Sequence, residues 1–330
     1  MLQRVVAALC LGMLMAPAHC QTETEASEAA AEKILVVGQR PGPGLWKISR
    51  DGHVLWVFGL YSPLPRNMVW RSTQVETILA QSQEYLTAPS ATAKLGFFRT
   101  LTLLPYAFGI RKNPDGAQLK DVLPAADYAR WQVLKQKYIG NDEGIERERP
   151  IFVANTLFNA GLQHAGLSSG HEVNMAIDAI ARKNKIKTTA SDVKLEFDDP
   201  AAMIKAFKKS ALDDTACFSR TLDRLETDID AMQVRANAWA KGDLEAIQKL
   251  SYADREQACD AAVMDSALLK SQPGMQSLQV RMQQAWLAAA EASLAANATT
   301  FATLPIRNIL DPTGYVMALQ AKGYLVETPD

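Results

Sequence analysis

The sequence predicts an α/β protein whose mixed β-sheet is formed from N- and C-terminal strands, flanked by helices, with a large helical insertion in the middle. Apolar runs of strand length lie near the start of the chain, at residues 45–49 and 54–60. Similar runs lie near its end, at residues 299–304 and 324–327. Between them, apolar residues recur at the three- and four-residue spacing of helices. This order indicates one sheet assembled from distant parts of the chain.

The N-terminal elements begin with an apolar run at residues 34–37, which we expect to be a strand. Asp51-Gly52 then separates two apolar runs and is a strong signal for the turn of a β-hairpin. Residues 73–82 have the apolar spacing of a helix, and residues 84–87 are typical of a buried strand. Residues 95–108 are apolar nearly all round, which predicts either a covered helix or a lid over a cleft.

The rest of the chain is predicted to be mainly helical. The expected helices span residues 124–138, 150–165, 173–183, 200–269, 276–296 and 313–321. Gly242 and Asp243 break the long region 200–269 near its middle, because this pair favours a turn. Residues 186–189 are expected to be a strand that returns to the sheet.

The first twenty residues have the order of a secretory signal peptide. Arg4 gives a basic start, an apolar run follows, and Ala16-Pro17-Ala18 has the small-residue pattern that signal peptidase cleaves. The apolar run is shorter than the roughly 20 residues that cross a bilayer, so we expect cleavage and release to the periplasm or the medium. The predicted organisation is a signal peptide at 1–20, a flexible acidic linker at 21–32, and a single domain at 33–330 with a helical insertion around 200–270.

The expected mature chain has a balanced charge. Loss of Arg4 with the leader leaves 34 basic and 36 acidic side chains, a formal charge of −2. This balance gives no electrostatic case for nucleic acid or for an anionic membrane as a partner. No later stretch is long and apolar enough to be a transmembrane segment.

Cys10 lies within the leader, and Cys20 either leaves with it or lies at the new N-terminus. Cys217 and Cys259 are therefore the cysteines certain to remain after processing. In an oxidising compartment two such cysteines usually bond to each other. The expected disulfide would join two helices, and a pair of buried thiols is the alternative.

Three separated stretches of the chain carry a family resemblance. The hairpin opens with Leu45-Trp46-Lys47-Ile48, and its second strand is followed by Leu64-Pro65. Gly170-His171-Glu172 opens a middle helix, and the chain ends in a strand, a helix and Gly323-Tyr324-Leu325-Val326. In this order and spacing the chain resembles the TraB/GumN family of bacterial Tiki-like hydrolases. Members of that family have an LWK hairpin ending in G-T-x-H, a G-x-D before a helix, and a C-terminal GYxV.

The resemblance implies a metal-dependent hydrolytic site, from which this chain departs. Family members place two histidines and two glutamates at strand ends, a ligand set suited to holding a divalent metal and polarising water. The matching positions here are Ser62, Ala88, Ser191 and Asn308. Glu84 or Glu196 would fill a glutamate position only if the register shifted by four or five residues.

The resemblance also implies a cleft beside these positions. Its candidate lining residues are Gly59, Tyr61, Glu172, Arg281 and Arg307. Arg281 matches an arginine that the family keeps in its penultimate helix.

The remaining histidines offer one alternative metal site. His164, His171 and Glu172 lie within nine residues of one another, and a relocated metal would use them. The alternative is a helix that ends at His164 and another that begins near Gly170, with Glu172 at the positive end of its dipole. His53, in the hairpin turn, is expected to be solvated.

Two functions follow from these observations. The replaced positions favour a non-catalytic, cleft-bearing binding protein of the cell envelope without a cofactor, whose ligand is a peptide, a small molecule or an envelope protein. The alternative is a metal-dependent hydrolase of peptidase or esterase type, using an ion such as zinc or manganese with an altered ligand set. No glycine-rich phosphate loop is present in the sequence.

Overall fold

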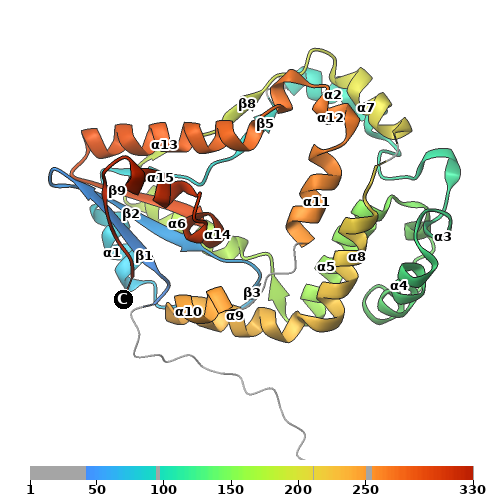
Figure 1. The fold of residues 1–330 in the computed structure, drawn as a ribbon, viewed down its shortest axis with the longest axis horizontal. Coiled ribbons are helices and arrows are strands. Elements are labelled where there is room, and N and C mark those ends of the chain that lie inside the picture. Colours follow the sequence, from blue (N-terminus) through green and yellow to red (C-terminus); the bar gives the residue numbers. More distant parts are fainter. Residues whose placement is uncertain (1–41, 94–96, 211, 250–254, 330) are drawn as a thin grey trace, which may run out of the picture. The chain divides into compact units, whose positions relative to one another are not determined.

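A six-stranded sheet in the order β10-β1-β2-β9-β4-β7 carries the fold (Figure 1). The structure is a computed structural model that describes residues 42–329 except 94–96, 211 and 250–254. The expected leader, the linker and the strand at 34–37 lie outside the described residues. The sheet strands are β1 (Leu45–Arg50), β2 (His53–Leu60), β4 (Glu84–Leu86), β7 (Lys187–Thr189), β9 (Thr299–Pro305) and β10 (Leu325–Glu327).

The sheet joins the two ends of the chain, which confirms the predicted fold class. β1 is antiparallel to both β2 and β10, whereas β2, β9, β4 and β7 run parallel to their neighbours. The central pair β2 and β9 is in register from Val54 opposite Thr299 to Leu60 opposite Pro305. The carboxyl ends of these four parallel strands therefore share one edge, where ligands bind in open α/β sheets.

A tight turn at Asp51 and Gly52 joins β1 to β2. Asp51 and Gly52 both have positive φ, 52° and 84°, the backbone that a two-residue hairpin loop needs. His53 begins β2, and the prediction that it is solvated is wrong. Its ring is half-buried, and Nδ1 donates to the carbonyl of Asn297 over 2.7 Å. Asn297 ends the long helix at residues 278–296, and this helix end lies beside the hairpin turn.

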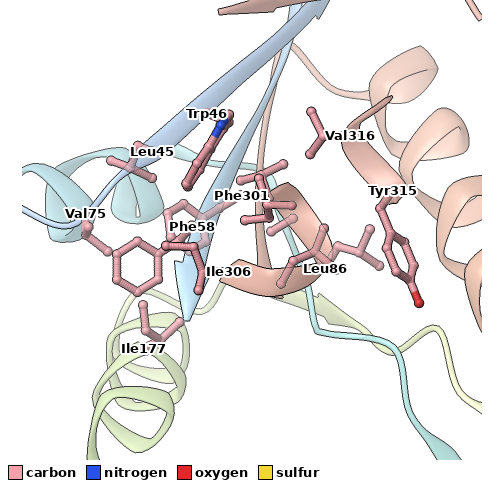
Figure 2. Packing of buried hydrophobic residues seen from close by; sticks show 14 of the residues in the cluster. Leu45, Trp46, Phe58, Val75, Leu86, Ile177, Phe301, Ile306, Tyr315 and Val316 are labelled. Carbon is pink, nitrogen blue, oxygen red and sulfur yellow. The ribbon is translucent and has the colours of Figure 1, made fainter. Parts of the chain in front are cut away.

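Helices cover both faces of the sheet. α1 (Thr73–Gln81) and α6 (His171–Lys183) lie on one face, and α13 (Leu278–Ala296), α14 (Ile306–Leu310) and α15 (Tyr315–Ala321) lie on the other. In Figure 2, Val75 and Ile177 approach the ring of Phe58, and Tyr315 lies near Leu86. Successive side chains of a strand point to opposite faces, so each strand supplies both layers of this core.

A second core lies among the helices of the middle region. Its elements are α3 (Leu119–Val122), α4 (Ala125–Tyr138), α5 (Pro150–His164), α8 (Thr215–Thr227), α9 (Ile229–Lys241) and α11 (Arg255–Met264). Trp131 and Phe218 meet edge to face at its centre, 5.9 Å apart. Cys217 of α8 and Cys259 of α11 lie in position for a disulfide, with Cα atoms 4.4 Å apart.

The region predicted as one long helical stretch is divided more often than expected. Besides α8, α9 and α11 it contains α7 (Pro200–Lys209), α10 (Leu244–Lys249) and α12 (Ala267–Lys270). The predicted break at Gly242 is confirmed, since this residue ends α9 in the left-handed conformation with φ 72°. The further breaks lack a glycine or proline, but Asp214, Asp228 and Ser266 stand at the N-caps of α8, α9 and α12. These N-cap residues are the local signal that the prediction did not use.

Helix α2 (Phe97–Ala107) lies within the stretch that was predicted to be either a covered helix or a lid. The helix itself is confirmed, but it packs against α7 and leaves Leu101, Leu104 and Phe108 exposed. Buried Arg149 fixes the far end of α7 by donating to the carbonyls of Phe207, Lys208 and Ser210. Carbonyls at a helix C-terminus have no partner within the helix, so a guanidinium is well suited to this place.

The smaller elements were not predicted, because runs of two or three residues carry no periodicity. β3 (Leu64–Pro65) pairs with β6 (Leu167–Ser168), and β5 (Ala91–Ala93) pairs with β8 (Val193–Leu195). Short 3-10 turns occur at η1 (Pro114–Gly116), η2 (Gly144–Arg147) and η3 (Pro273–Met275). Among the helices of the described residues, none combines the length and the apolar character that a bilayer span requires.

Candidate binding site at the carboxyl edge of the sheet

The four positions matched to the family's catalytic residues follow the four parallel strands. Ser62 lies two residues after β2, and Asn308 lies in α14 directly after β9. Ala88 and Ser191 each lie two residues after the end of β4 and β7. Because these strands are parallel neighbours, the topology brings all four positions to the same edge of the sheet, in the order Ser62, Asn308, Ala88, Ser191.

The side chains at these positions are neutral. Ser62 is exposed, and its hydroxyl donates to the carbonyl of Ser169 over 2.7 Å. Ser191 is buried, and within the described residues its hydroxyl has no hydrogen-bond partner. Asn308 is half-buried, and Ala88 offers only a methyl group. None of these groups brings a charge to the edge.

The start of α6 packs directly on the end of β2. Gly170 is the N-cap of α6 with φ 75°, and a Cβ on it would lie 2.9 Å from the carbonyl oxygen of Tyr61. A side chain at this position is therefore excluded both by the backbone conformation and by the close approach. Ser168 binds the helix start twice: its hydroxyl accepts from the Gly170 amide and donates to Glu172 over 2.9 Å.

A small pocket of about 60 Å³ lies beside this junction. Its wall combines apolar side chains with one cation and one anion, and its lining residues are Leu64, Pro65, Arg66, Met68, Trp70, Glu172 and Val173. The indole of Trp70 is held by Phe58 and Trp239, with ring centroids 5.6 and 6.0 Å away. Sequence reasoning identified Glu172 and missed Arg66, Met68 and Trp70, because they follow Leu64-Pro65 without a motif of their own.

Gly59 and Tyr61 position the strand end and do not line the pocket. The carbonyl of Gly59 accepts from the indole of Trp239 over 2.6 Å, and a Cβ at Gly59 would lie 2.9 Å from the ring of Trp46. Tyr61 is buried in the sheet core. Close packing at the end of β2 therefore accounts for a glycine at position 59 and for a buried tyrosine at position 61.

The two predicted arginines lie in α13 and α14 and do not line the pocket. Arg307 is exposed on α14, and its charge interacts electrostatically with the carboxyl group of Asp260 of α11. Burial raises the pKa of Asp260, and the charge of Arg307 opposes that rise. Arg281 of α13 donates to the carbonyl of Gly274 over 2.7 Å and thereby holds η3.

Glu84 and Glu196 do not move into the catalytic positions. Glu84 begins β4, so it lies at the amino edge of the sheet, opposite to the edge of Ser62 and Asn308. Glu196 is exposed and follows β8, outside the main sheet. The register shifts that would have rescued these two glutamates are therefore not adopted.

Four donors surround the Glu84 carboxylate. It accepts from Ser293 over 3.0 Å, from Asn297 over 2.7 Å and from Thr189, and it pairs with Lys187 over 2.9 Å. Burial by itself would raise the pKa of Glu84, but these four donors outweigh it and lower the pKa to about 2. The Glu84 carboxylate is thus ionised and hydrogen-bonded, and through it β4 is linked to β7 and to the end of α13.

His164 and His171 lie at a helix end and at a helix start. α5 ends at His164, whose ring meets Tyr138 edge to face at 5.3 Å, and α6 begins at His171. This is the helix end and helix start that the sequence offered as the alternative. Across the described residues, no group of three or more His, Cys, Asp or Glu side chains is placed to hold a metal ion.

Comparison with known families agrees with the topology. A model of the TraB/PrgY/gumN family matches residues 44–328. The chain belongs to the TraB/PrgY/gumN family. Comparison with curated proteins and with solved structures gives no match.

This TraB/PrgY/gumN family member does not fit the metal that the resemblance implied. A hydrolytic metal takes about three imidazole or carboxylate ligands and keeps one position open for water. At the carboxyl edge the matching positions hold two serines, an alanine and an asparagine. The buried Glu84 of β4 lies at the opposite edge, where its carboxylate is already hydrogen-bonded to Ser293 and Asn297. Neutral oxygen donors alone select poorly for zinc.

Proposed function

We propose that this TraB/PrgY/gumN family member is an exported, non-catalytic protein of the cell envelope that binds a peptide segment at the carboxyl edge of its sheet. The observation that carries the proposal is the pocket at the start of α6. It presents Arg66 and Glu172 around an apolar wall, at the edge whose matching catalytic positions have lost their charged side chains.

The size and chemistry of the pocket support a peptide over a free small molecule. Pockets for drug-sized ligands usually measure about 300–1,000 Å³. A pocket of about 60 Å³ holds one side chain or one chain terminus. One cation and one anion beside apolar side chains suit the mixed charge of a peptide.

Export is supported by the order of the first twenty residues and by the cysteine pair. The basic start, the apolar run and Ala16-Pro17-Ala18 predict a cleaved leader. Cys217 and Cys259 lie in position for a disulfide, which persists in oxidising compartments. The mature chain is expected to begin near His19 or Gln21.

The first test concerns the metal. Chelator-stripped mature protein is expected to bind zinc, manganese and cobalt with dissociation constants well above about 1 µM, as measured by calorimetry and elemental analysis. Stoichiometric binding at or below that value, abolished by Asn308→Ala, would restore the metal-dependent hydrolase. Tight binding abolished by His171→Ala would instead place a metal at the start of α6.

The second test concerns the pocket. Peptides selected from a random library for binding to the wild-type protein are expected to lose about tenfold in affinity to Arg66→Ala, because one charge-assisted contact is worth about 1.4 kcal/mol or more. Trp70→Phe should alter the tryptophan fluorescence change on binding. Arg182→Ala, an exposed arginine in the last turn of α6, is the matched control. Equal losses in Arg66→Ala and Arg182→Ala would contradict a role for the pocket.

A further inference from the structure

Helix α2 presents an apolar face that the rest of the described chain leaves exposed. Leu101 is 47% exposed, Leu104 is 60% exposed, and Phe108, directly after the helix, is 85% exposed. Residues three and four apart project from the same side of a helix, so these three side chains form one stripe. The opposite side of α2 packs on α7, where Lys205 lies over the ring of Tyr106 at 4.5 Å.

The border of this stripe is basic. α2 contains no acidic residue, and α7 contains Lys205, Lys208 and Lys209 and also no acidic residue. The ammonium group of Lys208 donates to the carbonyl of Phe108 over 2.7 Å, which places one cation at the end of the stripe. Asp199, the acid nearest to α7 in sequence, caps that helix by accepting from the Ala202 amide. The balanced charge of the whole chain therefore conceals a local basic region.

We propose that α2 and α7 form a peripheral docking surface for an anionic lipid bilayer. Leu101, Leu104 and Phe108 would enter the boundary between headgroups and acyl chains, with the lysines of α7 at the level of the lipid phosphates. Apolar side chains on one face with lysines beside them are the composition of helices that lie in a membrane interface. Each lysine close to an anionic leaflet adds its own attraction. This surface is separate from the pocket of the proposed function.

The charges favour a bilayer over a second copy of the chain. In a symmetric dimer the same patch meets itself, so both copies would bring Lys208, at the Phe108 end of the stripe, into one interface, and like charges at short range repel. An anionic bilayer pairs with the same lysines and also accepts side chains that protrude, such as Phe108. No groove is needed for this kind of contact.

Sedimentation with lipid vesicles tests the surface. The mature protein is expected to sediment with vesicles in which about one lipid in three is phosphatidylglycerol, to stay in solution with phosphatidylcholine vesicles, and to be released by high salt. The Leu104→Ser/Phe108→Ser variant should lose at least about tenfold in vesicle affinity, since two apolar side chains no longer leave water. Lys205→Glu/Lys209→Glu should lose a similar amount and most of the salt dependence.

Matched variants and gel filtration separate the outcomes. Val133→Ser removes an exposed valine from α4, and Lys183→Glu reverses an exposed lysine on α6, so both should sediment as the wild type does. All variants should keep the wild-type melting curve. Absence of sedimentation with the anionic vesicles would overturn the proposal. So would equal sedimentation of Leu104→Ser/Phe108→Ser and wild type, or a dimer in gel filtration that this variant dissociates.

Discussion

Reduction of the mature protein is expected to lower its free energy of unfolding by about 4 kcal/mol. A disulfide between Cys217 and Cys259 closes a loop of 42 residues, and restriction of the unfolded chain by a loop of that length gives this figure, which is an upper value because strain subtracts from it. The two cysteines join α8 to α11 within the helical core. Loss of the bond should therefore loosen α11 first, while the sheet keeps its own core.

Urea unfolding with and without reductant measures this loss. The Cys217→Ala/Cys259→Ala variant is the control, because reductant should not change its unfolding curve. Intact-mass measurement of protein isolated from the cell envelope tests the bond and the leader together, and alkylation without reductant should label neither Cys217 nor Cys259. Two thiols that react in the native, unreduced protein would contradict the disulfide. A mass that includes residues 1–18 would contradict export.

Glu84→Gln is expected to destabilise the protein by about 3 kcal/mol at pH 7. The donors around this carboxylate lower its pKa from 4.5 to about 2, and each pKa unit corresponds to about 1.4 kcal/mol. Glutamine keeps the size of the side chain but brings an NH₂ group to face the donors Thr189, Ser293 and Asn297. The ties between β4, β7 and α13 would then be weakened together.

The pH dependence identifies the cause of this loss. Because the folded-state pKa is lower than the unfolded-state value, the stabilisation is complete above about pH 4.5 and disappears as the pH falls through about 2. The difference between wild type and Glu84→Gln in urea unfolding should therefore shrink over that range. Glu143→Gln, an exposed glutamate in the loop before η2, is the control and should match the wild type throughout. A difference that stays constant with pH would point to packing instead of the charge.

Most of the elements were predictable because their signals are local. Asp51-Gly52 marks the hairpin through two positive φ angles, and the apolar spacing of residues 150–165 and 276–296 matches α5 and α13 closely. The short pairs β3–β6 and β5–β8 escaped prediction, since two or three residues show no period and their pairing depends on partners far away in sequence. The division of residues 200–269 into separate helices was missed although Asp214, Asp228 and Ser266 stand at the N-caps of the later helices.

The candidate site residues were chosen from the sequence, and their arrangement became visible only in the fold. Ser62 and Asn308 were matched through their flanking residues, and the parallel pairing of β2 with β9 then brought both to one edge. Arg66 and Trp70 became visible only where β3 and the start of α6 enclose a pocket. No spacing rule links them to Glu172, which is about a hundred residues away in the chain.

The order of residues along the chain was sufficient to predict the α/β class, most of the helices and the family. It also led to the expectation that the matched catalytic positions hold no charged side chain. The tertiary fold decided at which edge of the sheet a carboxylate such as that of Glu84 lies. It also decided which apolar helices are buried by other elements. Glu84 is four residues from Ala88, yet it lies at the opposite end of β4, held by donors from β7 and α13. α2 is apolar but largely uncovered, because burial depends on neighbours that are brought close only by the tertiary fold.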